Sequence, residues 1–261
     1  MNNMESILNK IILRLKEREK NNFKNFSYEN NNIKIHRNPI NILKLLEKEF
    51  FFIFEIKKAS PSKGIICENF DILKIYESYK KAGASAISII TEPDFFLGDI
   101  RYFIKIRERT HLPLLRKDFI IHPYQVYESF NIGADFILLI VRCLDKILLK
   151  ELYDLTLSLG MGVLLEIHDE KDLELAMSVS PKIIGINNRN LTNFQVDITN
   201  SIRLIREIPN NIYVISESGI TNSDEVKLLK DSGFSGVLIG ESILKSKDIL
   251  NKSNGLINGK N

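Results

Sequence analysis

Cysteine and histidine are scarce in this chain of 261 residues. The two cysteines, Cys67 and Cys143, lie far apart, and neither belongs to a CxxC motif. The four histidines show no metal-ligand spacing. These absences argue against a disulfide framework and a zinc site, and they fit a reducing compartment. We therefore expect a cytoplasmic protein without a zinc site.

Long apolar runs are also missing, because no stretch approaches the roughly 18 apolar residues that a membrane span needs. The net charge of +3 is too small to indicate nucleic acid or a membrane surface as a partner. The first twenty residues carry charges throughout and apolar residues at helical spacing, which indicates an amphipathic helix rather than a signal peptide. With 44% hydrophobic residues, a chain of this length can bury a large core.

Short apolar runs alternate with amphipathic segments along the chain. The runs are nearly continuous and rich in Ile, Val, Leu and Phe, as in strands buried on both faces. Strict alternation through eight units favours an α/β fold of the (β/α)8 or TIM-barrel type over an open doubly wound sheet, which usually carries a GxGxxG loop that is absent here. The predicted strands are Phe51–Lys58, Ala86–Thr91, Pro113–Lys117, Phe136–Ile140, Val163–Ile167, Ile183–Asn187, Tyr213–Ser216 and Gly236–Ile239.

A single domain is expected over residues 1–261, with an extra N-terminal helix in an extension of about 1–45 and a barrel over about 46–250. We predict that the polar segment Asn21–Asn41 forms a loop and that the tail after Lys245 frays beyond a short helix. Helix starts are expected at Asp71, Asp145 and Thr221–Ser223. Three glycines in a weak internal repeat are expected to end helices, namely Gly83, Gly133 and Gly233.

Charged residues occur at the ends of several predicted strands, where active sites lie in such barrels. Glu55 and Lys57 are two positions apart, so they face the same side of their strand. They are either a structural ion pair or functional groups, because unpaired buried charges are costly. Lys117 faces inward if Leu115 does, although a solvated charge cluster would also explain it.

Glu166 lies near the end of the predicted strand Val163–Ile167, where desolvation is expected to raise the pKa of its carboxyl. The neighbouring His168 is interpreted as a loop residue. The turn Ser60–Gly64 can be explained as an ordinary loop. Phe95 and Phe96, which are consecutive residues after the next strand, can be explained by loop packing, but their rings would also suit an aromatic substrate.

The last three strand ends offer groups that bind anions. Asn187 can hold a hydroxyl or carbonyl group, and Arg189 can pair with a carboxylate, although an Asn-rich turn would also fit. Ser218–Gly219 and Gly240–Ser242 expose backbone N–H groups at predicted helix starts on consecutive strands. That placement favours phosphate binding over simple helix capping.

Long, ordered motifs over about Phe51 to Leu244 make the chain similar to the indole-3-glycerol-phosphate synthase family of tryptophan biosynthesis. The chain shares with that family FEIKKASPSKG, GASAISIITEPDFFLG, LRKDFIIHPYQVYES, LLEIHDEKDLELA, GINNRNLTNFQVD, ISESGI and GVLIGES. One departure is His122, where the family pattern has Asp, and we expect it to alter only loop packing.

The resemblance implies conversion of 1-(2-carboxyphenylamino)-1-deoxyribulose 5-phosphate into indole-3-glycerol phosphate, carbon dioxide and water, with no metal or organic cofactor. It implies Lys117 as general acid in ring closure, Glu166 as base in dehydration and Lys57 as an anchor or second proton donor. An apolar wall and the second cation are expected to lower the pKa of Lys117 towards 7. The implied supporting and substrate-binding residues are Glu55, Asn187, Ser60, Phe96, Phe119, Arg189, Leu191, Ser218, Gly219, Gly240 and Glu241.

Two other functions are weighed. A phosphoribosylanthranilate isomerase would use a Cys/Asp pair, but neither cysteine lies at the end of the first strand. A catalytically inactive scaffold barrel would not need Lys57, Lys117 and Glu166. A phosphorylated small molecule is the expected partner, and association with other tryptophan-pathway enzymes stays open.

Overall fold

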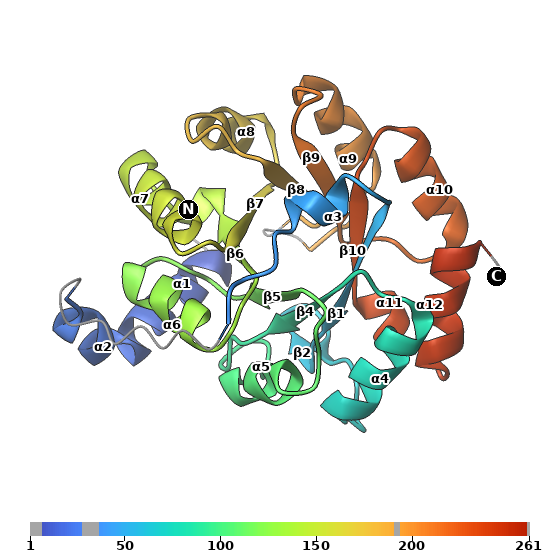
Figure 1. Ribbon diagram of the computed structural model, residues 1–261, viewed down its shortest axis with the longest axis horizontal. Coiled ribbons are helices and arrows are strands. Elements are labelled where there is room, and N and C mark those ends of the chain that lie inside the picture. Colours follow the sequence, from blue (N-terminus) through green and yellow to red (C-terminus); the bar gives the residue numbers. More distant parts are fainter. Residues whose placement is uncertain (1–6, 28–36, 191–193, 260–261) are drawn as a thin grey trace, which may run out of the picture.

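The computed structural model describes residues 7–27, 37–190 and 194–259. Within these residues, eight parallel strands close into a barrel in the order β1-β10-β9-β8-β7-β6-β5-β4, and the helices surround it (Figure 1). The predicted (β/α)8 barrel is confirmed, and the predicted strand ends agree to within one or two residues. The barrel strands are β1 (Phe51–Ile56), β4 (Ala86–Ile90), β5 (Leu114–Lys117), β6 (Phe136–Ile140), β7 (Gly162–Ile167), β8 (Ile183–Asn187), β9 (Tyr213–Glu217) and β10 (Gly236–Ile239).

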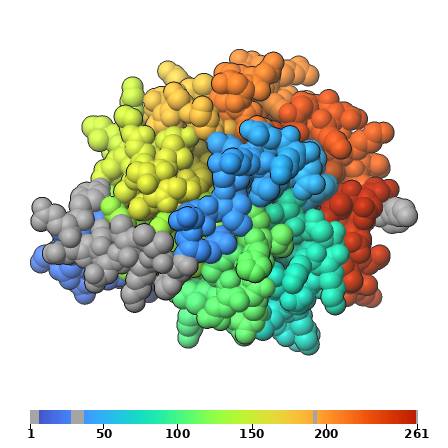
Figure 2. All heavy atoms as spheres, in the orientation of Figure 1, coloured from blue at the N-terminus to red at the C-terminus, as the bar shows by residue number. Residues whose placement is uncertain are grey.

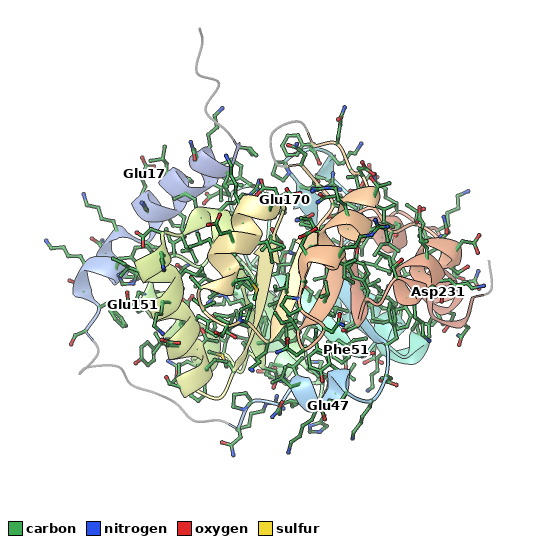
Figure 3. The ribbon with its side chains drawn as sticks, turned by 90° about the horizontal axis from the view of Figure 1, so that it is seen from above. Glu17, Glu47, Phe51, Glu151, Glu170 and Asp231 are labelled. Carbon is green, nitrogen blue, oxygen red and sulfur yellow. The ribbon has the colours of Figure 1, made fainter. Side chains whose placement is uncertain are left out.

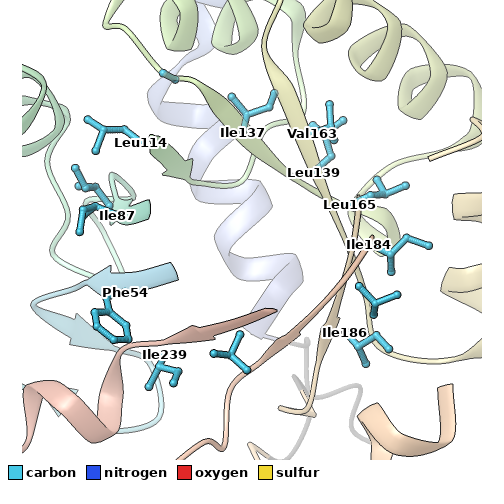
Figure 4. Close-up of a cluster of buried hydrophobic side chains, with 14 of the residues drawn as sticks. Phe54, Ile87, Leu114, Ile137, Leu139, Val163, Leu165, Ile184, Ile186 and Ile239 are labelled. Carbon is cyan, nitrogen blue, oxygen red and sulfur yellow. The ribbon is translucent and has the colours of Figure 1, made fainter. Parts of the chain in front are cut away.

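Two layers of apolar side chains stabilise the barrel, because each strand is buried on both faces. Residues that point outward pack under the helices, among them Phe54 on β1 and Ile87 on β4 (Figure 4). Residues that point inward, such as Phe51 and Leu164, fill the barrel interior. The surrounding helices are α4 (Ile72–Ala82), α5 (Ile100–Arg107), α6 (Pro123–Asn131), α7 (Lys146–Ser158), α8 (Glu170–Met177), α9 (Thr199–Leu204), α10 (Ser223–Asp231), α11 (Glu241–Leu244) and α12 (Ile249–Asn258), with short 3-10 turns η1 (Val141–Cys143) and η2 (Ile205–Glu207).

The predicted helix boundaries follow from local chemistry. The side chains of Asp71 and Asp145 accept backbone N–H groups at the starts of α4 and α7, and Asn222 forms a capping box with Glu225 on α10. The three glycines expected to end helices all have positive φ angles, which are 91° at Gly83, 85° at Gly133 and 92° at Gly233.

The chain before the barrel covers both of its ends. Helix α3 (Leu43–Leu46) closes the end where the strands begin, with Ile42 and Leu46 in the inner core. Figure 2 shows this blue segment across the centre of that face. Helix α1 (Ile7–Arg18) is amphipathic as predicted and buries Ile11 and Leu15. Figure 3 shows α1 with Glu17 at the opposite end from Glu47 and Phe51, so α1 lies where the strands terminate.

The predicted loop over Asn21–Asn41 is wrong at its start, because α2 (Lys20–Asn25) extends into it. The ring of Phe23 stacks on His122 with a centroid distance of 4.2 Å, and Phe26 meets the same ring edge-on. His122 also caps α6, since its Nδ1 accepts the N–H of Tyr124 at 3.1 Å. His122 therefore caps α6, as an Asp at this position would, and its ring also contacts the N-terminal segment through Phe23 and Phe26.

The predicted turn Ser60–Gly64 is present, and it closes a hairpin in which β2 (Ala59–Ser60) pairs with β3 (Gly64–Ile65). The C-terminal segment differs from the prediction. The tail after Lys245 does not fray early, because α12 extends to Asn258, buries Ser253 and Leu256, and packs against α4. Among the residues described, none of the helices has the length and apolar character that a membrane crossing requires.

Candidate active site

The alternation of side chains along each strand decides which groups face the barrel interior. On β5, Leu115 belongs to the inner core, so Lys117 two positions later also points inward. The same parity places Glu55 on β1, Glu166 on β7 and Glu217 on β9 at the carboxyl end of the interior. Charged groups therefore replace apolar ones where the strands end.

The ammonium group of Lys117 lies between two buried carboxylates. Its Nζ is 2.9 Å from Glu217 Oε2 and 3.2 Å from Glu166 Oε2. Asn187 on β8 hydrogen-bonds to Glu166 through its side chain and accepts the backbone N–H of Arg189 at 3.0 Å. Four strands thus fix one acid–base cluster, and closure of the barrel brings together members that lie 21 to 100 positions apart in the sequence.

This cluster reverses two expectations about pKa values. Burial lowers the pKa of Lys117, but the charges of Glu217 and Glu166 outweigh burial and raise it above its ordinary value. The expected lowering is wrong because it counted the cation of Lys57 and omitted Glu217. Burial raises the pKa of Glu166, but the charges of Lys117 and His168 leave it below its ordinary value, so the expected rise is wrong as well.

Glu217 is the functional candidate that the sequence analysis missed. Burial together with the charge of Glu166 raises the pKa of Glu217 to about 7, although Lys117 opposes that rise. A glycine makes room for it, since a Cβ added to Gly185 would lie 2.1 Å from Glu217 Oε1. Glu217 lies two positions after Ile215, which faces inward, so strand alternation could have identified it. The sequence prediction at this strand end considered only Ser218–Gly219, as phosphate-binding residues.

Lys57 and Glu55 form the ion pair that the sequence allowed, with 2.6 Å between Lys57 Nζ and Glu55 Oε1. Gly240, directly after the neighbouring β10, leaves space for this carboxylate, because an added Cβ would approach Glu55 Oε1 to 2.7 Å. Both charged residues line the same cavity as Lys117. The pair therefore has structural contacts and also lies within the site.

The cavity at this end of the barrel has a volume of about 580 Å³. Ile7 and Ile11 of α1 contribute to its rim, and the hydroxyl of Ser60 is buried there without a hydrogen-bond partner among the described residues. Leu191 lies outside the described residues. The other predicted site residues all line this cavity, namely Glu55, Lys57, Ser60, Phe96, Lys117, Phe119, Glu166, Asn187, Arg189, Ser218, Gly219, Gly240 and Glu241.

The loop after β4 supplies an aromatic wall. Its conformation is set by Glu92, whose buried carboxylate accepts backbone N–H groups of Asp94, Phe95 and Phe96 at 2.7 to 3.0 Å. The ring of Phe96 then lies 6.1 Å from that of Phe119, measured between centroids. The cavity therefore combines charged groups on the strands with an apolar surface on one side.

The loops after β9 and β10 border the cavity on another side. Ser218 and Gly219 are consecutive residues with positive φ angles of 66° and 85°, and their backbone lies on the cavity wall. Arg189 does not point freely into the cavity, because its Nη2 lies 2.9 Å from Glu241 Oε2. Within the described chain, no group of three or more His, Cys, Asp or Glu residues could hold a metal ion.

The fold and the charged cavity together define a (β/α)8-barrel enzyme. The family model described as Indole-3-glycerol phosphate synthase matches residues 4–256. The chain therefore belongs to the indole-3-glycerol phosphate synthase family.

Curated relatives agree with this membership. The indole-3-glycerol phosphate synthase of Ruminiclostridium cellulolyticum is 50% identical over 200 residues, which cover 77% of each chain. The enzyme of the same name from Campylobacter jejuni is 44% identical over 248 residues, covering 93% of this chain and 96% of the relative. The protein is a carboxy-lyase of tryptophan biosynthesis that acts on a phosphorylated substrate. The scaffold and isomerase alternatives are thereby set aside.

Solved structures of low sequence identity confirm the fold alone. The 3-hexulose-6-phosphate synthase of Salmonella typhimurium superimposes with a TM-score of 0.66 at 14% identity, covering 80% of this chain and 98% of that one. The N-acetylmannosamine-6-phosphate 2-epimerase of Clostridium perfringens gives a TM-score of 0.60 at 18% identity, covering 80% and 93%.

Proposed function

We propose that Lys117 is the general acid in ring closure and Glu166 the general base in the dehydration that completes indole-3-glycerol phosphate formation. The observation that carries this proposal is the position of Lys117 Nζ, which faces the cavity between two buried carboxylates. The raised pKa of Lys117 keeps a proton on the donor at neutral pH, and the lowered pKa of Glu166 keeps the base ionised.

The remaining predicted residues surround these two. Lys57 is suited to anchor an anionic group or deliver a second proton, and its pair with Glu55 holds it at the cavity wall. Asn187 orients Glu166 through a side-chain hydrogen bond. For the substrate, we assign the aryl ring to Phe96, Phe119, Leu191 and Arg189, and the phosphate to Ser60, Ser218, Gly219, Gly240 and the backbone amide of Glu241.

The test is to add 1-(2-carboxyphenylamino)-1-deoxyribulose 5-phosphate to purified protein and follow indole fluorescence. Lys117→Ala and Glu166→Gln are each expected to lower kcat by at least about 100-fold, because a positioned proton donor or acceptor contributes about that much or more. Circular dichroism serves as the folding control. Turnover close to wild type in either variant removes that residue from the mechanism.

We also propose that the enzyme works in the cytosol, since Cys67 and Cys143 are both free thiols. Cell fractionation with an antibody to the chain tests this location. Association with other tryptophan-pathway enzymes stays a prediction, which size-exclusion chromatography of the mixed purified enzymes would check.

A further inference from the structure

His168 follows β7 directly, in the loop position that the sequence analysis expected, but its side chain is only 4% exposed. Its two ring nitrogens face two different carboxylates. Nε2 lies 3.4 Å from Glu166 Oε1, and Nδ1 lies 3.4 Å from Asp172 Oδ2. Neither nitrogen has a nearer hydrogen-bond partner among the residues described. An imidazole buried between two carboxylates can donate to one of them when neutral and to both when doubly protonated.

The two oxygens of Glu166 have separate partners. Oε2 faces Lys117 at 3.2 Å and thus the cavity, whereas Oε1 faces His168. The carboxylate plane is therefore set by contacts on both sides. A contact of 3.4 Å is slightly longer than an ordinary hydrogen bond, and catalytic contacts are often loose until substrate is bound.

The far side of His168 is rigidly held. Asp172 Oδ2 accepts the backbone N–H of His168 at 2.8 Å and also accepts two N–H groups of Arg142, at 2.9 Å from Nε and 2.6 Å from Nη2. Arg142 in turn reaches Asp169, which caps α8. Asn200 donates to the carbonyl oxygen of His168 at 3.1 Å. The imidazole thus has a fixed backbone and a fixed anionic neighbour.

We propose that His168 is a positioning residue for Glu166, and that the chain Arg142–Asp172–His168 holds Glu166 Oε1 so that Oε2 stays aimed at Lys117 and the substrate. The proposal rests on the assignment of Glu166 as the base. The contacts resemble those by which buried carboxylates orient histidines in other catalytic sites, here with the order reversed, since the imidazole orients the carboxylate.

His168 also acts on the charge of Glu166, because its charge contributes to the lowered pKa of that carboxyl. The titratable and charged groups around His168 come from β7, α8, η1 and, through Glu166, β5 and β9. These groups are Glu166, Asp169, Asp172, Arg142, Cys143, Lys117 and Glu217. Loss of the imidazole should therefore move the acid limb of kcat, where Glu166 becomes protonated, to higher pH.

Two substitutions separate the two sides of the ring. His168→Asn keeps a donor near Nδ1 and removes the one that faces Glu166, whereas His168→Gln keeps a neutral donor near Nε2. We expect kcat to fall by about tenfold to 100-fold in His168→Asn, with KM within about twofold, because a misplaced catalytic group costs about that much. In His168→Gln, kcat above the acid limb should stay within about threefold of wild type, but the limb should still move to higher pH.

Three controls make the result decisive. His111→Gln changes an exposed histidine outside the cavity and should alter neither kcat nor the acid limb. In a Glu166→Gln background, His168→Asn should cost less than about a further twofold, since its effect passes through Glu166. If His168→Asn does not fold, the acid limb of His168→Gln supplies the same readout.

The possible outcomes are distinct. Wild-type turnover in Glu166→Gln overturns the assigned base and the present proposal together. Loss of turnover in Glu166→Gln, with wild-type kcat and acid limb in both His168 variants, overturns the role of His168 alone. A full additional loss from His168→Asn in the Glu166→Gln background also overturns it, because that result indicates an effect independent of Glu166.

Discussion

His122 shows how one side chain serves two elements. It caps α6 through Nδ1 and stacks on Phe23 of α2. An Asp at this position would also cap, but it offers no ring for the stack. The departure from the family pattern is visible in the sequence, but the contact is not, because Phe23 lies 99 positions earlier in the chain.

The cap predicts a pH dependence of stability. Burial lowers the pKa of His122 below its ordinary value near 6.5, and Nδ1 can accept the N–H of Tyr124 only while that nitrogen is unprotonated. The unfolded chain therefore binds this proton more readily, so the stabilisation is complete above pH 6.5 and is lost as pH falls through the lower, folded value. Melting curves from pH 7.5 to 5 should show wild type losing more stability than His122→Asp; parallel losses would contradict this.

At the scale of elements, Asp135 connects segments that are distant in the sequence. It is fully buried before β6 and pairs with Arg37 and with Arg107, whose Nη1 lies 2.8 Å from Oδ2. Its carboxylate also accepts the backbone N–H groups of Ile40 at 2.7 Å and Leu114 at 2.8 Å. One carboxylate thus ties the segment before α3 to α5 and to the start of β5.

We expect Asp135→Ala to lower the free energy of unfolding by about 3–5 kcal/mol, because it leaves two arginines without their buried counter-charge. Urea unfolding followed by circular dichroism measures the change. Asp145→Asn is the control, since Asn also caps helices well and should shift stability by only a few tenths of a kcal/mol. A loss below about 1 kcal/mol in Asp135→Ala would show that solvent or neighbouring groups replace its contacts.

At the scale of the whole molecule, helix α1 lies over the cavity and is tied to the loop after β4. Arg18 pairs with Asp94 and lies 3.6 Å from Glu92 Oε1, measured from Nη1, and Arg14 Nε lies 3.3 Å from Asp94 Oδ1. Glu92 also sets the conformation of Phe96. The position of the N-terminal helix is therefore coupled to the aromatic wall of the site.

Arg18→Ala should raise KM about fivefold to tenfold while kcat stays within about twofold, because charged hydrogen bonds of this kind contribute roughly 1–2 kcal/mol. The ratio of variant to wild-type KM should shrink at high salt, which screens the pairs in wild type. Progress curves of indole fluorescence supply both constants. Arg101→Ala, which breaks only an exposed pair with Asp99, is the control and should leave KM unchanged; an unchanged KM in Arg18→Ala would show that α1 docks without these pairs.

Local chemistry in the sequence was sufficient to predict the strands and the helix caps, because periodicity and capping depend on neighbours a few residues apart. It left the inward orientation of Lys117 conditional on that of Leu115, which the barrel core confirms. Thirteen of the cavity-lining residues were predicted from two sources: strand ends, where barrel sites collect, supplied most of them, and the family resemblance supplied others such as Phe119. The pKa directions of Lys117 and Glu166 could not be predicted in this way. The direction for Lys117 depends on Glu217, which strand closure brings within 2.9 Å from 100 positions away. The direction for Glu166 depends on the charges of Lys117 and His168, and electrostatic effects of this kind follow distance in space rather than in sequence.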